Sequence, residues 1–286
     1  MSRDFTVELV ACLGDPVREN PTGVMQNAAF RALGLRWSYL TIPVTPASLR
    51  DAIVGIRALG LRGANFTIPH KVAVMEYLDR IAPDAALIGA VNTVRREGDL
   101  LIGENTDGKG FLRGLQLDAG IDPAGKSAVV LGAGGASRAI VTELALARAS
   151  SILVVNRSPE RGESMVSELA RKTRAPIRFE TWPTIYRIPP GIDLLVNATS
   201  IGLYPDISAV VPVDWSRASS QMLVCDVVPN PPDTHFLQEA RRRGLPVLDG
   251  LSMLVHQGAI GFQMWTGLDA PVTVMQDALR AAFAPE

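Results

Sequence analysis

The sequence predicts an α/β protein built from two domains. Strand-like apolar runs alternate with segments of helical spacing through most of the chain, which is typical of parallel βαβ units. The chain has 286 residues, enough for two domains that each bury a core of their own. Near its middle, an apolar run that ends in glycines begins a new βαβ unit. We therefore expect a first domain formed by residues 1–105 and 246–286, and a second formed by residues 106–245.

Three strand–helix pairs are expected in the first third of the chain. Apolar residues recur at helical spacing before Gly34, which is expected to end the first helix. Two short strands with a polar turn between them follow, and the chain turns helical again near the domain boundary. The expected strands are 9–13, 37–44, 63–68, 90–93 and 100–103, and the expected helices are 25–33, 49–59, 72–81 and 107–117.

The second domain is expected to open on a strand that runs into the glycines. A helix and another strand come next, followed by short apolar strands and a helical final stretch. Pro271 suits the first turn of the last helix, where backbone amides have no helical partner. The expected strands are 127–131, 152–155, 193–196 and 223–227, and the expected helices are 136–147 and those of the stretch from Leu251 onward.

Charge and cysteine content exclude several classes of protein. The formal net charge of −1 creates no long-range field for nucleic acid or anionic lipid. The arginines at 241–243 are expected on a solvated helix face near a helix C-terminus. Cys12 and Cys225 lack the spacing of a disulfide framework or metal site. No apolar run reaches the roughly 18 residues of a membrane span. We therefore expect a soluble cytoplasmic protein with no nucleic-acid or membrane partner.

The glycine-rich run at 132–137 is a candidate phosphate-binding turn, because a predicted strand precedes it and a predicted helix follows. Gly132 permits the tight turn, and Gly134 lets the backbone approach a pyrophosphate, whose charge would face the amides of the helix N-terminus. Ser137 is small enough for close helix packing, although the third glycine of the usual pattern is absent. A glycine turn without a ligand is the alternative. The expected dinucleotide contacts in this run are Gly132, Gly134, Gly135 and Ala136.

The end of the next predicted strand distinguishes NADP from NAD. A carboxylate there would bind the ribose hydroxyls and repel a 2′-phosphate, but the chain has Asn156, Arg157 and Ser158 at this point. Arg161 lies one turn further along. A guanidinium and a hydroxyl can both bind a phosphate, so the sequence predicts NADP as cofactor. A surface arginine is the alternative interpretation, and it competes more strongly for Arg161 than for Arg157.

Several ordered motifs now resemble those of the shikimate dehydrogenase family. They are Asn-Phe-Thr-Ile-Pro-His-Lys at 65–71, Ala-Val-Asn-Thr at 90–93, Asn-Thr-Asp-Gly at 105–108, Gly-Leu-Ser-Met-Leu-Val-His-Gln at 250–257 and Trp-Thr-Gly at 265–267. The likeness covers nearly the whole chain. It implies an N-terminal α/β substrate domain and a Rossmann-type NADP domain, with the active site in the cleft between them. It also implies a monomeric or homodimeric enzyme of aromatic amino acid biosynthesis that interconverts 3-dehydroshikimate and shikimate.

The resemblance assigns roles to individual residues. Lys71 and Asp107 are implied to flank the reacting hydroxyl or ketone. The implied contacts to the ring hydroxyls are Asn65, Thr67, Asn92 and Gln257, and the cofactor contacts include Thr199 and Met253, the latter against the nicotinamide. The chemistry is reasonable in its own right, because hydride addition to a carbonyl leaves negative charge that an ammonium group can stabilise or protonate. A surface ion pair is the alternative for Lys71 and Asp107. His70 is expected to pack or cap, and no metal site is expected because no three ligands cluster.

Two positions depart from the family pattern. Family members usually bind the substrate carboxylate with two serines one residue apart, and ungapped alignment puts Asn20 and Thr22 there, both able to donate hydrogen bonds. Asn20 can equally cap a helix that starts at Pro21. Pro229 stands where the family commonly has a tyrosine. A site with fewer polar partners discriminates differently among hydroxylated analogues. Quinate or another polyhydroxy cyclic acid therefore remains an alternative substrate, and a non-catalytic NADP-binding regulator remains an alternative of another class.

Overall fold

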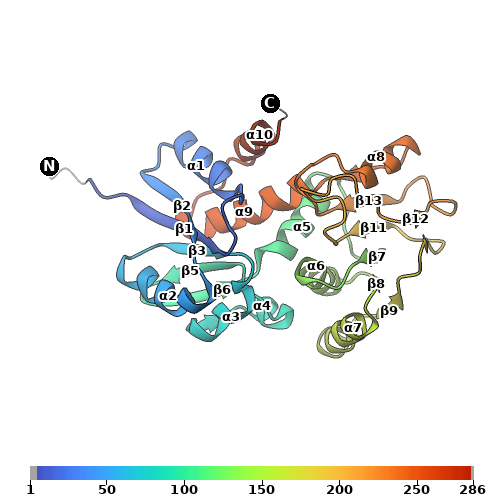
Figure 1. The fold of residues 1–286 in the computed structure, drawn as a ribbon, viewed down its shortest axis with the longest axis horizontal. Coiled ribbons are helices and arrows are strands. Elements are labelled where there is room, and N and C mark those ends of the chain that lie inside the picture. Colours follow the sequence, from blue (N-terminus) through green and yellow to red (C-terminus); the bar gives the residue numbers. More distant parts are fainter. Residues whose placement is uncertain (1–4, 285–286) are drawn as a thin grey trace. The chain divides into compact units, whose positions relative to one another are not determined.

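The computed structural model describes residues 5–284, which form two compact units (Figure 1). Unit 1 holds the chain up to Thr106 and resumes at Val255, and unit 2 holds Asp107–Leu254. Both passages of the chain between the units lie in helices. Helix α5 (Thr106–Leu117) starts at the first passage, and helix α9 (Gly250–Thr266) contains the second. The middle of the chain is therefore an insertion into unit 1.

Unit 1 is built on a mixed six-stranded sheet of order β2-β1-β3-β5-β6-β4. Strand β1 pairs in parallel with β2 and β3, whereas β5 runs antiparallel to both of its neighbours. The three parallel strands therefore share one carboxyl edge, where side chains from different segments can converge. The strands are β1 (Glu8–Gly14), β2 (Trp37–Pro43), β3 (Gly63–Phe66), β4 (Arg80–Ile81), β5 (Thr93–Glu97) and β6 (Leu100–Glu104).

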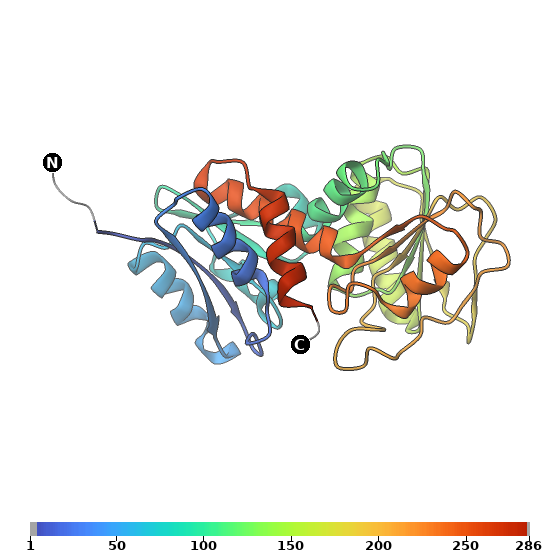
Figure 2. The same cartoon turned by 90° about the horizontal axis from the view of Figure 1, so that it is seen from above.

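Helices on both faces bury this sheet. Ile53 and Ile56 of α2 (Leu49–Ala58) pack against alternate residues of β1 and β3 in one apolar cluster. Elsewhere in the unit, α1 (Thr22–Ala32) packs beside α10 (Val272–Ala282) and the second half of α9 (Figure 2). There the rings of Phe30 and Phe262 stack with centroids 5.3 Å apart. Unit 1 therefore depends on segments from both ends of the chain.

Gly63 in β3 is required by the close approach of α9. A Cβ atom at this position would overlap the indole of Trp265 and the carbonyl of Val94. The indole nitrogen of Trp265 donates a hydrogen bond of 3.0 Å to that same carbonyl. The missing side chain thus lets helix and sheet approach closely enough to bury the tryptophan and satisfy its polar atom.

Unit 2 contains a six-stranded parallel sheet of order β9-β8-β7-β11-β13-β14. In chain order this is 3-2-1-4-5-6, the arrangement of the Rossmann fold, with its switch point between the first and fourth strands. Ligands of such sheets bind at the carboxyl ends of the strands near that point. The strands are β7 (Ser127–Leu131), β8 (Ser151–Asn156), β9 (Ile177–Thr181), β11 (Leu194–Asn197), β13 (Leu223–Asp226) and β14 (Val247–Leu248), and β10 (Tyr186–Arg187) pairs separately with β12 (Val213–Asp214).

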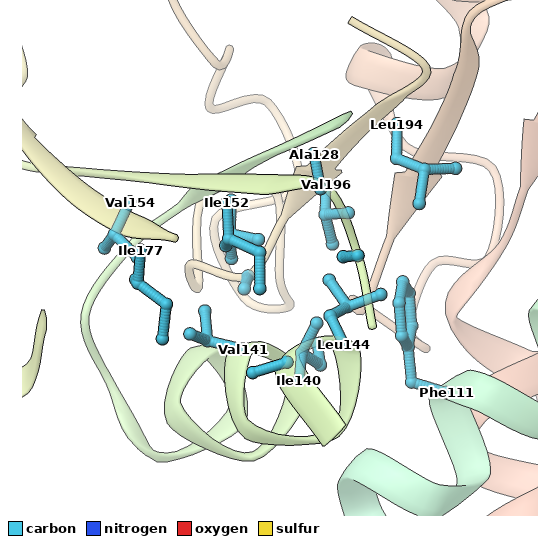
Figure 3. Close-up of a cluster of buried hydrophobic side chains, with 14 of the residues drawn as sticks. Phe111, Ala128, Ile140, Val141, Leu144, Ile152, Val154, Ile177, Leu194 and Val196 are labelled. Atoms are coloured by element: carbon cyan, nitrogen blue, oxygen red, sulfur yellow. The ribbon is translucent and has the colours of Figure 1, made fainter. Parts of the chain in front are cut away.

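Alternate residues of the parallel strands supply two apolar layers. Ile140, Val141 and Leu144 of α6 (Gly135–Leu146) point toward the sheet residues Ile152 and Val196 in Figure 3. Helix α7 (Pro159–Thr173) packs into the same layer. The opposite face of the sheet is covered by α8 (His235–Arg242). Burial on both faces explains why the central strands β7, β8, β11 and β13 are apolar runs that the sequence predicted, whereas the edge strands β9 and β14 were not predicted.

The structure corrects the helix expected over 72–81. The chain instead forms the short helix α3 (His70–Ala73), a 3-10 turn over Val74–Tyr77 and the edge strand β4. Asp79 is the cause, because it exchanges backbone and side-chain hydrogen bonds with Leu101 at 3.0 and 2.7 Å. These long-range bonds pull the segment into the sheet, and Pro83 then begins helix α4 (Pro83–Ile88).

Smaller differences concern strand limits. The strand expected over 90–93 begins only at Thr93, because the amides of Val91 and Asn92 bond to the carbonyls of Lys71 and Glu104 in a turn. Helices α4 and α7 are additional to the expected elements. The arginines at 241–243 lie at the C-terminal end of α8, as expected, and pair with Asp233 and Glu239. Within residues 5–284, each helix is too short or too polar to span a bilayer.

Candidate active site

A chain of buried side-chain hydrogen bonds lies in unit 1. It starts at Tyr39 of β2, whose phenol donates to the Asn65 carbonyl oxygen Oδ1 over 2.6 Å. The Asn65 amide nitrogen Nδ2 in turn donates to the hydroxyl of Thr93 at 2.8 Å and to the backbone carbonyl of Asn92 at 3.1 Å. Tyr39 is 3% exposed and Asn65 is 7% exposed. Strands β2, β3 and β5 are thus tied together by polar groups that burial makes costly to leave unpaired.

The hydroxyl of Thr106 joins the remaining members of this network. It lies 3.0 Å from the hydroxyl of Thr93, accepts from Nδ2 of Asn92 at 3.0 Å and donates to Oε1 of Gln257 at 3.3 Å. The Thr106 amide also donates to Oδ1 of Asn92 at 2.7 Å. Three residues expected to bind ring hydroxyls, Asn65, Asn92 and Gln257, are therefore brought together by unit 1 itself.

Lys71 and Thr67 stand close to the carboxyl end of β1. The Thr67 amide bonds to the carbonyl of Leu13 at 3.0 Å, and Lys71 follows in α3. Burial raises the pKa of the Cys12 thiol to about 11, and the neighbouring Tyr39 hydroxyl and the positive charge of Lys71 partly oppose that rise. Cys12 is the register partner of Asn65 in the adjacent strand β3, so the positive charge acts beside the network.

His70 is a packing residue, as expected. It is 1% exposed, and its Nε2 lies 2.7 Å from the carbonyl of Val44. Among residues 5–284, no three His, Cys, Asp or Glu side chains are grouped so as to hold a metal ion.

Asn20 and Thr22 hold the start of α1. Oδ1 of Asn20 accepts from the Thr22 amide at 3.0 Å, and Pro21 has the helical angles φ −83° and ψ −2°. The expected capping arrangement is wrong by one residue: regular helix begins at Thr22, Pro21 occupies the N-cap position, and Asn20 bonds to the first turn from the position before it. Thr22 is only 4% exposed, and its hydroxyl bonds to the Tyr39 phenol. Asn20 and Thr67 also line a cavity of about 420 Å³ together with Pro16, Val17, Arg18 and Glu19.

The glycine turn of unit 2 leaves room for a ligand. Gly132 has a φ of +111°, and a Cβ there would fall 2.9 Å from the Ala198 carbonyl oxygen, so only glycine fits. A Cβ at Gly134 or Gly135 would meet nothing within 4 Å. The buried hydroxyl of Ser137 bonds to the Gly132 carbonyl at 2.6 Å and locks the turn. The surface around Gly134 and Gly135, at the start of α6, is therefore open, and Ala136 lies in the first turn of that helix. A helix N-terminus with open space beside it suits a phosphate group.

Unit 2 also has a cavity, with a volume of about 900 Å³, and Arg157 lines it. Other parts of its wall come from the segments after β9 and β11, including Trp182, Thr184 and Ser200. Arg157 thus places a guanidinium beside the carboxyl ends of adjacent parallel strands. Asp206 also lines this cavity, so its wall carries charges of both signs.

Asn156 and Ser158, the neighbours of Arg157, hold the turn between β8 and α7 and do not line the cavity. The side-chain Nδ2 of Asn156 donates to the backbone carbonyl of Ser158 at 3.0 Å. The Ser158 hydroxyl accepts from the backbone amide of Arg161 at 3.5 Å and so caps α7. The side chain of Arg161 is exposed in the first turn of that helix. Thr199 bonds to Oδ1 of Asn197 at 2.7 Å, next to the cavity residue Ser200.

Asp107 and Met253 also belong to unit 2. Asp107 is partly buried in the first turn of α5, where an acidic residue suits the helix dipole. Its neighbour Gly108 lies so close to the Ala139 carbonyl of α6 that a Cβ would overlap it. Met253 is partly buried against the core of unit 2. Lys71 and Asp107 therefore come from different units.

The sequence reasoning missed Tyr39, Thr93 and Thr106 as members of the unit 1 network. Thr93 and Thr106 lie inside the recognisable motifs and could have been found there, whereas Tyr39 gives no signal beyond being a polar residue in a strand. Asp226 was missed as well. It is 2% exposed at the end of β13, where it accepts bonds from Asn197, Val228 and Thr234. Burial raises the pKa of this carboxyl group to about 6, against the opposing effect of these bonds.

Comparison with known proteins gives consistent matches over both units. Residues 12–94 match the shikimate dehydrogenase substrate binding domain, 117–233 match shikimate / quinate 5-dehydrogenase, and 250–280 match the shikimate 5′-dehydrogenase C-terminal domain. The shikimate dehydrogenase (NADP(+)) of Moorella thermoacetica is 47% identical over 278 residues, which cover 96% of this chain and 93% of that protein.

Two solved structures are similar along almost the whole chain. The ligand-free 5-ketofructose reductase of Gluconobacter sp. strain CHM43 matches with a TM-score of 0.94 and 43% identity, over 98% of this chain and all of that one. A shikimate dehydrogenase in complex with NADP+ matches with a TM-score of 0.91 and 37% identity, over 98% of this chain and 96% of that one.

Proposed function

Because the chain belongs to the shikimate dehydrogenase family, we propose that it is an NADP-dependent dehydrogenase that interconverts 3-dehydroshikimate and shikimate. The observation that carries the proposal is the buried network of unit 1. It holds Asn65, Asn92 and Gln257 together near the strand end that feels the charge of Lys71. Convergent polar groups of this kind orient a hydroxylated ring. We assign substrate binding to unit 1 and NADP binding to unit 2. Residues 246–254, expected in the substrate domain, are part of unit 2, where Val247–Leu248 form a strand of its sheet.

The residues of unit 2 fit NADP. The open space at Gly134 and Gly135 would admit the pyrophosphate to the amides of α6. Arg157 would bind the 2′-phosphate, with Ser158 and Arg161 nearby and Thr199 and Met253 completing the contacts. When bound, NADP supplies or accepts the hydride at the reacting carbon. The cavity beside Arg157 is the main support for the choice of NADP over NAD.

Lys71 manages the charge on the reacting oxygen. Its ammonium group stabilises the oxygen as the carbonyl is reduced and donates the proton that completes the alcohol, and it takes that proton back in the opposite direction. Asp107 orients the ammonium group. Asn65, Thr67, Asn92 and Gln257 bond the ring hydroxyls, while Asn20 and Thr22 stand at the carboxylate position. We place the enzyme in the cytoplasm, as a monomer or homodimer.

A neutral polyhydroxy ketone such as 5-ketofructose is a second candidate substrate. The structure of a 5-ketofructose reductase is as similar to this chain as that of the shikimate dehydrogenase. In addition, Arg18 and Glu19 balance each other in the wall of the 420 Å³ cavity. The hydroxyl of Thr22 is already engaged with the phenol of Tyr39, so the side-chain NH2 group of Asn20 is the donor that these two positions offer a carboxylate. A site with few donors directed at a carboxylate suits a neutral substrate better than an anionic one.

Steady-state kinetics separate these candidates. The kcat/KM values for 3-dehydroshikimate and 5-ketofructose with NADPH, and for shikimate and quinate with NADP+ and NAD+, are compared under one set of conditions. The proposal predicts the highest value for the shikimate pair with NADP. A higher value for 5-ketofructose would establish the second candidate. Absence of turnover despite tight NADPH binding would indicate a non-catalytic regulator. The similarity to shikimate dehydrogenases over nearly the whole chain disfavours that alternative, and it also disfavours quinate as the main substrate.

A further inference from the structure

The direction of the hydrogen bonds around Asn65 limits what this residue can do for a ligand. A side-chain amide has two donor hydrogens on Nδ2 and two acceptor lone pairs on Oδ1. Both donors are used inside the protein, one by the Asn92 carbonyl at 3.1 Å and one by the Thr93 hydroxyl at 2.8 Å. On the acceptor side, Tyr39 occupies one lone pair at 2.6 Å. The capacity that remains on Asn65 is a single acceptor position.

The alternative amide orientation is blocked. Rotating the amide by half a turn would bring Oδ1 against the Asn92 carbonyl, where two acceptors repel each other, and would place Nδ2 against the phenol of Tyr39. The Asn92 carbonyl cannot change its role because it has no hydrogen to donate. The phenol of Tyr39 could accept from Nδ2 only by giving up its donation. Tyr39 and the Asn92 backbone therefore fix the amide together.

The phenol of Tyr39 is itself held as a donor. Burial raises its pKa well above 10, so it keeps its hydrogen. The Thr22 hydroxyl bonds to it as a donor, which leaves the phenol hydrogen for Asn65 or for the nearby Cys12. Sulfur is a weak acceptor, and the bond to Asn65 is short. Donation therefore runs in one direction from Thr22 through Tyr39 to Asn65.

We propose that Tyr39 is a positioning residue that holds Asn65 as an acceptor, so that the site selects substrates carrying a hydroxyl that donates a hydrogen bond at this point. The inference rests on the proposed function, in which Asn65 contacts a ring hydroxyl. Specificity then comes from two properties of Asn65: its Oδ1 can accept a hydrogen bond from the ligand, and its Nδ2 has no hydrogen left to donate to the ligand. A ligand group that only accepts, such as a carbonyl or a fluorine, meets an oxygen and is rejected.

Substrate analogues test the wild-type enzyme directly. Each ring hydroxyl of shikimate is replaced in turn by hydrogen or by fluorine, which accepts weakly and cannot donate. At one ring position, the deoxy and fluoro analogues should both lose about 10- to 100-fold in kcat/KM, the cost of leaving a buried acceptor unpaired. If fluorine is tolerated at every ring position, Asn65 is not restricted to accepting and the inference is wrong.

The variant Tyr39→Phe tests the positioning role. Without the phenol, only the Asn92 carbonyl and the Thr93 hydroxyl still orient the Asn65 amide. Its orientation is then less strictly held, so KM should rise about tenfold with kcat within about twofold, and the discrimination against the fluoro analogue should shrink. Tyr186→Phe is the matched control, because Tyr186 is also fully buried but its hydroxyl has no hydrogen-bond partner among residues 5–284. A purely structural role for Tyr39 would lower activity without changing the discrimination, and that result would overturn the proposal.

Failure of the proposed function gives a different result. A wild-type enzyme that does not turn over shikimate refutes that function and leaves the state of Asn65 to be measured by NMR in the ligand-free protein. Slow exchange of both Asn65 side-chain amide protons, faster in Tyr39→Phe, would support the inference. Rapid exchange of these protons in the wild type would refute it.

Discussion

The two units build their sites in different ways. In unit 2, the turn at 132–137 and the strand end at Arg157 supply the site mainly through backbone and local sequence. In unit 1, the site depends on side chains from distant segments, as in the pairs Tyr39–Asn65 and Thr106–Gln257, which are 26 and 151 positions apart. A local site can be recognised from a short motif. A site made by convergence depends on the whole sheet, so one substitution affects several members.

The largest expected effect tests the contribution of unit 1 to the chemical step. Lys71→Ala should lower kcat by about 10²- to 10⁴-fold, because the reacting oxygen loses its proton donor. The dissociation constant of NADPH, measured by fluorescence titration, should stay within about twofold. Lys172→Ala, which removes an exposed ion pair with Glu168 in α7, is the control and should leave kcat unchanged. A loss below tenfold in Lys71→Ala would remove the lysine from the chemical step.

The next effect tests how local the cofactor site is. Arg157→Ala should lower kcat/KM with NADPH by about 10- to 100-fold, the worth of a charge-assisted bond to phosphate, with little change for NADH. Arg178→Ala, an exposed residue of β9, serves as the control. Equal losses of kcat/KM with NADPH and NADH would show that Arg157 maintains the turn and does not bind the 2′-phosphate.

A third prediction concerns the convergence of distant segments in unit 1. Gly63→Ala should lower the free energy of unfolding by about 1–3 kcal/mol, because the new methyl group collides with Trp265 and the Val94 carbonyl. Gly55→Ala in α2, where a Cβ meets nothing within 4 Å, should instead raise it by about 0.5–1 kcal/mol. Urea denaturation measures both. Similar effects of the two variants would contradict the tight approach of α9 to β3.

The smallest expected effect concerns the buried carboxyl group of Asp226 in unit 2 and the pH dependence of stability. Since the pKa of Asp226 is raised to about 6 from 3.8, its contribution to stability is fully present below about pH 4 and is lost as the pH rises through 6. In Asp226→Asn this fall in unfolding free energy between pH 4 and 7 should disappear. Asp214→Asn is the control, because the pKa of half-buried Asp214 is lowered by its bond from the Ser216 amide, so its contribution is lost only as the pH falls. An unchanged pH slope in Asp226→Asn would show that this carboxylate does not titrate in that range.

Features encoded by local sequence could be predicted, whereas features made by distant segments could not. Most strands were predictable because burial on both faces of a sheet makes them apolar, and the glycine turn was predictable because its φ angle requires glycine. The helix expected over 72–81 was wrong because Asp79 pairs with Leu101 across the sheet, which no local pattern encodes. A structural use of Asn20 at the start of α1 was foreseen, since its bond to the Thr22 amide spans only two residues, but the N-cap position belongs to Pro21. Tyr39 could not be foreseen, because its role arises only when β2 lies beside β1.

The order in which the units are completed during synthesis follows from the insertion of unit 2. Residues Asp107–Leu254 emerge from the ribosome as one uninterrupted stretch, whereas the helices that pack against α1 in unit 1 are made only after it. Domains generally fold as they are completed. The nucleotide-binding half of the nascent chain can therefore fold first, while an apolar surface of α1 awaits its partners. Chaperones that recognise exposed apolar surface would find it on the half that was translated earliest.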